Sequence, residues 1–451
     1  MDLVTRNTAM IFRRVRTYAT LFVSLTLVAV AYAQERSLPY IYERAMTNDA
    51  QLQAARAAFR AAQERLPQAL AAMRPNINLR VNRSHNDLRR HQTPGFTQNP
   101  TSHSQYFSGS QSLVVQQPLF QRQLEAAELI ALATIEEAQA QLESEERALA
   151  MRVATAYFDT LRTQDQVALS ATDRLRAAEQ LEAAKNAWLS GSGAQSDVDA
   201  ASARLAISQV TEYKAQAALA LAYQSLTILS QEPVSSVRLP PVEPDPHEFI
   251  NSDWEQAIAQ AQNNNAQVRA LKARLKASQH VLTQSKAAHL PTVSAYGQVS
   301  HSRSDSVNSV GSNYRNRSVG IELNLPIYVG GQTSSAIREA QAQSEQALAS
   351  LRAAQRELEI KLRQEHANLS SAAQQNNALN QALQAATRLV TGSQRLAETG
   401  YKSRIDITDA KRQQQQIQTE LDQVRYKTNL SLLNWIMLTG GDIGGAIQQM
   451  N

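Results

Sequence analysis

Four stretches of the 451-residue chain alternate apolar and polar residues with a period of two, as a strand with one apolar face does. The strands are expected at about residues 75–86, 105–117, 291–301 and 314–325. A polar, turn-rich stretch separates the members of each pair, so each pair is predicted to form a hairpin with a long loop. The strand boundaries are marked by Pro75, Pro118, Pro291 and Pro326. Strands of roughly ten residues suit a tilted crossing of a bilayer.

Apolar residues recur at helical spacing through the Ala-, Gln-, Glu- and Leu-rich parts of the chain. Helices are expected at about residues 40–73, 121–189, 196–229, 253–289, 332–399 and 405–438. The two longest have coiled-coil character, and each would extend roughly 100 Å. They end at glycine, at Gly191 and Gly193 in one case and at Gly400 in the other, and the chain then returns as a second helix. Each unit is therefore a helical hairpin.

The two halves of the chain are repeats of each other. Residues 45–77 align without a gap on residues 261–293 with 13 identities in 33 positions, and Pro75 falls on Pro291. The first repeat is expected at residues 34–232 and the second at 253–441, with a Pro-rich linker at 233–252 and a C-terminal tail at 442–451. Each repeat reads helix, strand, strand, long helix, turn, helix.

The formal charge of +5 comes largely from the N-terminus. Residues 1–33 combine a basic start, an apolar run from Ala19 to Val30 and a small-residue end, which predicts a cleavable secretory signal peptide. A membrane anchor is the competing interpretation, but the run is too short to span ~30 Å of hydrocarbon. No later segment has 18 consecutive apolar residues, so no transmembrane helix is expected in the exported chain. Its charge would be about +2, which removes the basis for nucleic-acid binding.

Little in the sequence points to chemistry. The absence of cysteine excludes a disulfide scaffold, thiolate metal sites and a cysteine nucleophile. Nucleophile-elbow, phosphate-loop, zinc-protease and dinucleotide motifs are missing. The scattered histidines have no ligand spacing, and they are His85, His91, His103 and His301. We expect no enzyme activity, no cofactor and no metal site.

With the repeats in place, the chain resembles the TolC-like outer-membrane factor family, which includes type I secretion and multidrug-efflux members. The resemblance covers essentially all of Ser37 to Gly441. Its most specific parts are the repeats, the helix end Met73-Arg74-Pro75, the strand exits at 117–120 and 325–331, and a tip motif of Gly, Asp six residues on and Ala ten on. The tip motif occurs as Gly191, Asp197, Ala201 and again as Gly400, Asp406, Ala410.

The resemblance implies a mainly α fold with a small β part. Three chains would close a 12-stranded transmembrane β-barrel in the outer membrane, above a long α-helical coiled-coil tunnel in the periplasm. Elementary physics agrees, because four strands cannot close a barrel and open strand edges are prohibitive in lipid, so a cyclic oligomer is required.

The resemblance also implies that the glycine turns form the periplasmic mouth, where the second-repeat helices close the tunnel. Asp406 and Asp409 share a helix face, and threefold symmetry would make each a ring of carboxylates that favours cations. Lys402 stands where the family places a basic residue that ties the inner hairpin to the outer one. Ser196 and Asp197 match its partner positions.

Simpler roles compete with these assignments. Asp197 and Asp406 could serve only as first-turn charges facing the helix dipole, and Asp409 could lie on a solvated face. Ala397 stands where the best-known members carry a gate tyrosine, so that latch can be weaker here. The strand aromatics, Tyr106, Phe107, Tyr296 and Tyr314, could form a membrane girdle or pack within the strands.

The function expected is that of a passive, trimeric exit duct of a type I secretion or efflux system. It would be gated at its periplasmic tip and would dock with a periplasmic adaptor and an inner-membrane ABC or proton-driven pump. The alternative is a periplasmic coiled-coil adaptor or structural protein that never enters the outer membrane. A solute porin is disfavoured by the share of helix. The cargo stays open.

Overall fold

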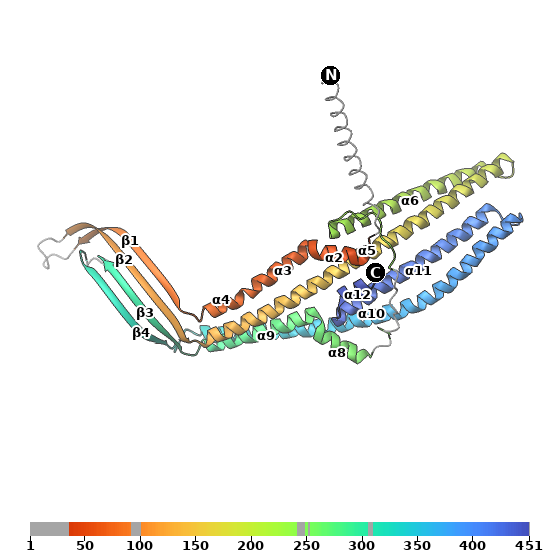
Figure 1. Ribbon diagram of the computed structural model, residues 1–451. Coiled ribbons are helices and arrows are strands. Elements are labelled where there is room, and N and C mark those ends of the chain that lie inside the picture. The colour runs from red at the N-terminus through yellow and green to blue at the C-terminus, as the bar shows by residue number, and fades with distance from the viewer. Residues whose placement is uncertain (1–35, 92–100, 241–248, 251–252, 305–309, 451) are drawn as a thin grey trace, which may run out of the picture. The chain divides into compact units, whose positions relative to one another are not determined.

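The computed structural model describes residues 36–91, 101–240, 249–250, 253–304 and 310–450, so the expected signal peptide and much of the expected linker lie outside the described residues. The described part is mainly helical with one small sheet (Figure 1). None of its helices has the length and apolar character needed to cross a membrane.

The strands form a single antiparallel sheet in the order β1-β2-β3-β4 (Figure 1). Its members are β1 (Asn76–His91), β2 (Thr101–Phe120), β3 (Thr292–Arg303) and β4 (Asn313–Asn324). The two expected hairpins are joined because β2 pairs with β3, with Val115 opposite Gly297 and Leu113 opposite Val299. β1 and β4 lie at the two edges of the sheet.

The expected ends of the first hairpin were wrong. β1 continues from Asn86 to His91 and β2 begins at Thr101, because polar residues past the clear alternation still pair across the hairpin. β2 also runs through Pro118 to Phe120. Pro118 is tolerated because β1 ends its pairing at Gln116, and an irregularity in the β2–β3 register follows at once. β1 and β3 begin one residue after Pro75 and Pro291, and β4 ends two residues before Pro326.

The expected helices at 40–73 and 253–289 are each interrupted. The first consists of α2 (Leu38–Asn48), α3 (Ala50–Gln63) and α4 (Arg65–Ala71), and the second of α8 (Trp254–Asn264) and α9 (Ala266–Ala287). The breaks at Asp49 (ψ 123°) and Asn265 (ψ 126°) are extended and occupy equivalent repeat positions. At the first break, Asn48 donates to the Ser230 carbonyl at 3.0 Å; at the second, Asn265 donates to the Leu438 carbonyl at 3.1 Å.

Two helical hairpins follow the strands. α5 (Arg122–Leu189, 68 residues) returns as α6 (Gln195–Ser230), and α10 (Gln332–Glu398, 67 residues) returns as α11 (Arg404–Thr439). The expected C-terminal tail contains a further short helix, α12 (Ile443–Gln449), whose Ile443 and Ile447 are buried. Asp442 caps it by accepting a hydrogen bond from the Gly445 backbone at 3.0 Å.

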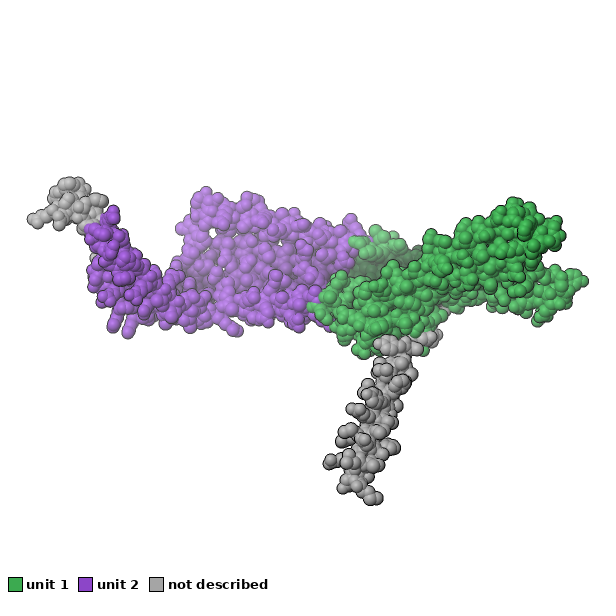
Figure 2. All heavy atoms as spheres, turned by 90° about the horizontal axis from the view of Figure 1, so that it is seen from above, with its two compact units in different colours: residues 1–53, 144–265, 357–451 green, residues 54–143, 266–356 purple. Residues whose placement is uncertain are grey.

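The chain divides into two compact units (Figure 2), and each draws on both repeats. Residues 1–53, 144–265 and 357–451 form unit 1, whose core contains Tyr157, Phe158 and Leu432. Residues 54–143 and 266–356 form unit 2, which holds the sheet and the adjoining helices. Small residues such as Ala133 allow the helices of unit 2 to approach closely, and Arg269 pairs with Glu143 at 2.5 Å.

Candidate functional site

The tips of the two hairpins need glycine for their backbone conformation. Gly191 has φ +76° and Gly400 has φ +78°, the left-handed region that ends many helices. In the second tip, Tyr401 N–H donates to the Leu396 carbonyl at 2.9 Å. Gly193 avoids crowding instead, because a Cβ there would lie 3.1 Å from that of Ala187. The positions of both turns therefore follow from glycines in the local sequence.

Asp197 and Asp406 cap the helices that leave these turns. Asp406 accepts from the Ser403 backbone at 2.8 Å and from the Ser403 hydroxyl at 2.7 Å, and these two bonds lower the pKa of Asp406 below its usual value. Asp197 accepts from the Ala194 backbone at 3.3 Å. Both carboxylates are exposed, as is Ser196. Within one chain, the simpler first-turn role accounts for the observed contacts of Asp197 and Asp406.

Lys402 does not reach Asp197 within this chain. Its Nζ donates to the Ser393 hydroxyl at 3.1 Å, on the same hairpin. Asp409 does not lie on an unpartnered solvated face, because it forms an ion pair with Arg176 of α5. The link between Lys402 and the Ser196–Asp197 pair therefore stays a prediction, whereas Asp409 is tied to the first hairpin.

The Asp409 pair belongs to a series of polar contacts between α5 and α11, which we call the α5–α11 ladder. Its contacts are Asp165 with Tyr426 (2.9 Å), Asp173 with Arg412 (2.8 Å), Arg176 with Asp409, and Glu179 with Thr408 and with Arg404 (3.6 Å). The four α5 residues lie within about a third of the helix circumference. The ladder thus joins the long helix of one hairpin to the short helix of the other.

One contact of the ladder involves a buried aromatic side chain. Tyr426 is 6% exposed, and its hydroxyl donates to Asp165. Burial raises the pKa of Asp165 to about 6; the Tyr426 hydrogen bond lowers it in part, and the Asp422 carboxylate raises it further. Burial also raises the pKa of Tyr426, as does the charge of Asp165. This carboxyl titrates near neutral pH, unlike an ordinary aspartate.

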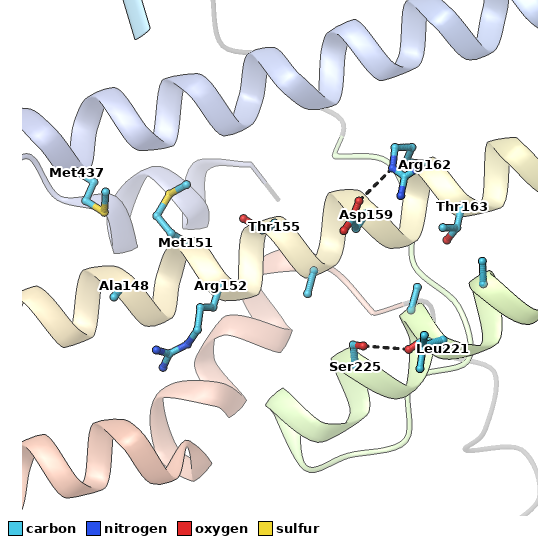
Figure 3. A pocket seen from close by; sticks show the side chains of 13 residues that line it. Ala148, Met151, Arg152, Thr155, Asp159, Arg162, Thr163, Leu221, Ser225 and Met437 are labelled. Carbon is cyan, nitrogen blue, oxygen red and sulfur yellow. Dashed lines mark hydrogen bonds and ion pairs between the residues drawn. The ribbon is translucent and has the colours of Figure 1, made fainter. Parts of the chain in front are cut away.

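A hollow of about 750 Å³ opens beside this region, between α5 and α6, with Met437 of α11 at its wall (Figure 3). Its lining is largely apolar and includes Met151, Ala218 and Leu221. Asp159 and Arg162, which lie at its wall, pair with each other at 3.0 Å. Among the described residues no group of three or more His, Asp or Glu side chains could hold a metal ion.

The ladder was not predicted from the sequence. The available signal was the spacing of charged residues, at positions 165, 173, 176 and 179 of one predicted helix and at 404, 409 and 412 of another. The spacing places each set on one side of its helix, but it does not say which helix lies opposite.

Two outer-membrane and secretion proteins align with most of the chain. The chain is 26% identical over 423 residues to the outer membrane protein TolC of Vibrio cholerae, spanning 92% of this chain and 93% of that protein. It is also 26% identical over 393 residues to the alkaline protease secretion protein AprF of Pseudomonas aeruginosa, spanning 85% and 80%.

Solved structures share the fold. The outer-membrane channel OprN superimposes with a TM-score of 0.71 at 20% identity, covering 90% of each chain. The CmeC outer membrane channel of Campylobacter jejuni superimposes with a TM-score of 0.73 at 14% identity, covering 92% of this chain and 89% of CmeC.

The sequence profile of one family, described as outer membrane efflux protein, matches residues 41–230 and 257–441, which include both hairpins and all four strands. The resemblance to the TolC-like outer-membrane factors is thereby confirmed, and the family's location, the outer membrane, agrees with the expectation from the sequence. The chain belongs to the outer membrane efflux protein family of secretion and efflux channels.

Proposed function

We propose that three copies of this chain form a passive exit duct through the outer membrane and the periplasm, closed at the hairpin tips by contacts that include the α5–α11 ladder. The duct would be one part of a tripartite system, with a periplasmic adaptor and an inner-membrane ABC or proton-driven pump supplying the energy. The observation that carries the proposal is a difference in burial between two equivalent helices, α6 and α11.

α6 and α11 have the same length, 36 residues, and occupy the same place in their repeats. α11 buries a dozen residues and packs against α5, with Tyr426 5.9 Å from the ring of Phe158. α6 buries five residues. Five of its large apolar side chains are instead more than half exposed, namely Ile207, Val210, Tyr213, Leu221 and Ile228.

The internal repeat indicates which helix would cover the exposed apolar side chains of α6. Since α11 of the second repeat packs on α5 of the first, the equivalent partner of α6 is α10 of a second repeat, supplied by another chain. The hollow of Figure 3, which includes Leu221, would lie in that contact. The edge strands β1 and β4 also require other chains, because each has one edge without a partner strand in this sheet. Three copies of a four-stranded sheet would give the 12 strands that the family resemblance implies.

The ladder suits a gate because its Arg176–Asp409 and Asp173–Arg412 ion pairs are weak. Arg176 and Asp409 are 37% and 46% exposed, and Asp173 and Arg412 are similar. Partly exposed pairs stabilise by about 0.2–1 kcal/mol each. The docking of a partner protein at the tips would be enough to exchange these contacts, which allows the α11 helices to move outward.

The gate is tested by single-channel conductance in planar bilayers. Arg176→Ala combined with Arg412→Ala should raise the conductance, because two of the three ion pairs between α5 and α11 are lost. Arg122→Ala is the matched control, since Arg122 pairs with Glu125 on α5 itself. Unchanged conductance in the double variant removes the ladder from the gate.

The Lys402 latch is tested separately. Lys402→Ala with Asp197→Ala should raise conductance if Lys402 exchanges its bond to Ser393 for one to Asp197 of the tip. A variant that conducts as the wild type does would leave Lys402 with only its observed role within the second hairpin. Asp406→Asn and Asp409→Asn should each reduce cation selectivity if these residues form carboxylate rings.

The periplasmic adaptor is the competing function, and fractionation separates the two. Heat-modifiable trimers in the detergent-extracted outer-membrane fraction support the duct. Release of the protein by osmotic shock would instead support the adaptor. The cargo is addressed by a deletion strain, tested for drug sensitivity and for loss of a secreted protease, because AprF is by its name a protease secretion protein.

A further inference from the structure

The two faces of the β-sheet differ in chemistry. Alternate residues along each strand lie on opposite faces, and the register fixes which residues share a face. The outer face, which we define as the face of Ile77, carries exposed apolar side chains near the helices. They include Ile77, Leu79, Leu113, Val299, Val319, Ile321 and Leu323, all more than 40% exposed.

Arginines replace these apolar residues toward the hairpin loops. On the outer face lie five exposed arginines, which we call the cationic belt: Arg83, Arg89, Arg303, Arg315 and Arg317. The change can be followed across rows of paired residues. Ile77, Val115, Gly297 and Val319 form an apolar row; Val81, Gln111, His301 and Arg315 form a mixed row; Arg83, Gly109, Arg303 and Asn313 form a cationic row.

The opposite face is polar, and its described charged side chains include Arg80 and Glu322. It carries hydroxyl and amide side chains, among them Asn82, Ser84, Ser110, Ser112, Ser300 and Ser318. Tyr106, Tyr296 and Tyr314 also lie there, whereas Phe107 lies on the outer face. Three of the four aromatics considered for a membrane girdle are therefore on the side away from the apolar rows.

Two arginines of the belt flank an open position. Arg83 on β1 and Arg303 on β3 are both paired with Gly109 on β2, so their Cα atoms are about 10 Å apart. Gly109 has no side chain to fill the space between them, and a Cβ there would meet only the Asn82 carbonyl, at 3.4 Å. Two guanidinium groups can thus converge on one anion.

The surroundings leave the belt positively charged. Asp87 is the acidic residue that the described strands place on this face, and it already accepts from His103 at 2.6 Å and from Gln105 at 3.3 Å. Phe107 lies between Arg83, 5.5 Å from its ring centre, and His85, 4.9 Å away. An aromatic ring beside an arginine is suited to the junction of apolar and charged regions.

We propose that the cationic belt binds the phosphate groups of a phosphorylated glycolipid in the outer leaflet of the membrane, with its acyl chains against the apolar rows. The inference rests on the proposed function, because it requires the outer face to meet lipid and the hairpin loops to face outward. Arginine favours phosphate through paired hydrogen bonds. The boundary of arginines crosses the rows obliquely, from Arg83 on β1 to Arg317 on β4, as a membrane plane does for tilted strands.

The test uses the purified full-length protein in detergent and a bisphosphorylated lipid A as the probe. Bound lipid is counted by native mass spectrometry, and the same lipid with its phosphates removed is the comparison. The wild type should bind the phosphorylated form more tightly. Arg83→Gln with Arg303→Gln should weaken that binding roughly 25-fold, about fivefold for each arginine.

Two further variants sharpen the result. Arg80→Gln is the matched control, because Arg80 lies on β1 but on the opposite face, and it should bind as the wild type does. Gly109→Leu should also weaken binding, because it fills the space between the two arginines. Equal affinity of the wild type for both lipids, or an equal loss in Arg80→Gln, overturns the proposal.

Sorting and assembly are measured for every variant, so that the two proposals fail separately. If the wild-type protein forms no heat-modifiable trimers in the outer-membrane fraction, the proposed duct is contradicted. Normal trimers without a preference for the phosphorylated lipid would contradict the belt alone. If the double variant does not assemble, the affinities of the wild type for the phosphorylated and the dephosphorylated lipid still test whether the cationic belt binds phosphate.

Discussion

Asp165 makes the contact between α5 and α11 sensitive to pH. Its pKa is raised from 3.8 to about 6, chiefly by burial. Below about pH 3 the carboxyl is protonated whether or not the helices are packed. Between pH 4 and 6 it ionises more readily in the unfolded chain, so the stability of the packed form falls as pH rises. Above about pH 7 the packed form is destabilised by the full free energy that corresponds to the pKa shift.

The magnitude follows from the shift. Two pKa units correspond to about 3 kcal/mol, and partial exposure of Asp165 to solvent reduces this to roughly 1–2 kcal/mol. Asp165→Asn keeps the shape and removes the charge. At pH 7.5 it should therefore slow amide exchange of α11 around Tyr426 by roughly 5- to 30-fold relative to the wild type. At pH 5 the slowing should be clearly smaller, roughly half as large in free energy, because Asp165 is then mostly protonated in the packed form but still ionised in the opened form.

Hydrogen–deuterium exchange with peptide resolution measures this at both pH values. Asp159→Asn is the matched control, because Asp159 is an exposed α5 carboxylate that pairs with Arg162 on its own helix. It should change exchange at neither pH. The reasoning is refuted if Asp165→Asn speeds exchange at pH 7.5, or if its effect is the same at pH 5.

Four further substitutions test the local structure by thermal unfolding. Gly400→Ala should destabilise by about 1 kcal/mol because φ there is +78°, whereas Gly392→Ala inside α10 should stabilise by up to about 1 kcal/mol; equal effects would contradict the turn. Asn265→Ala should cost about 1–2 kcal/mol through its lost bond to the Leu438 carbonyl, and an unchanged midpoint would show that the break needs no such tie. Ser403→Ala should cost about 1 kcal/mol by removing the α11 cap, seen also as faster exchange in its first turn.

Much of the fold could be predicted because its signals are local. The period of two predicts the strands, and the glycines at 191 and 400 predict the tips, since few other residues adopt positive φ. The breaks at Asp49 and Asn265 were harder to see, because both residues sit in alanine-rich helical sequence. The extended residues are stabilised by hydrogen bonds to distant helix ends. Asn48, beside the first break, donates to the Ser230 carbonyl of α6, and Asn265 donates to the Leu438 carbonyl of α11.

The candidate gate could be predicted only in part. Caps such as Ser403 with Asp406 lie within one turn and are readable from spacing. The ladder joins residues such as Arg176 and Asp409, which are 233 positions apart, and no local pattern pairs them. The sheet register, in contrast, follows from alternation once the strand order is known, and it is the register that separates the cationic belt from the polar face.

The unpaired edges of the four-stranded sheet have a genetic consequence. If β1 of one chain must join β4 of the next, a chain that folds but carries a defective gate still enters assemblies with normal chains. With equal amounts of both, only about one trimer in eight would contain three normal copies. Gate mutations in this protein are therefore expected to be dominant over the wild-type allele, whereas mutations that prevent the sheet from forming are expected to be recessive.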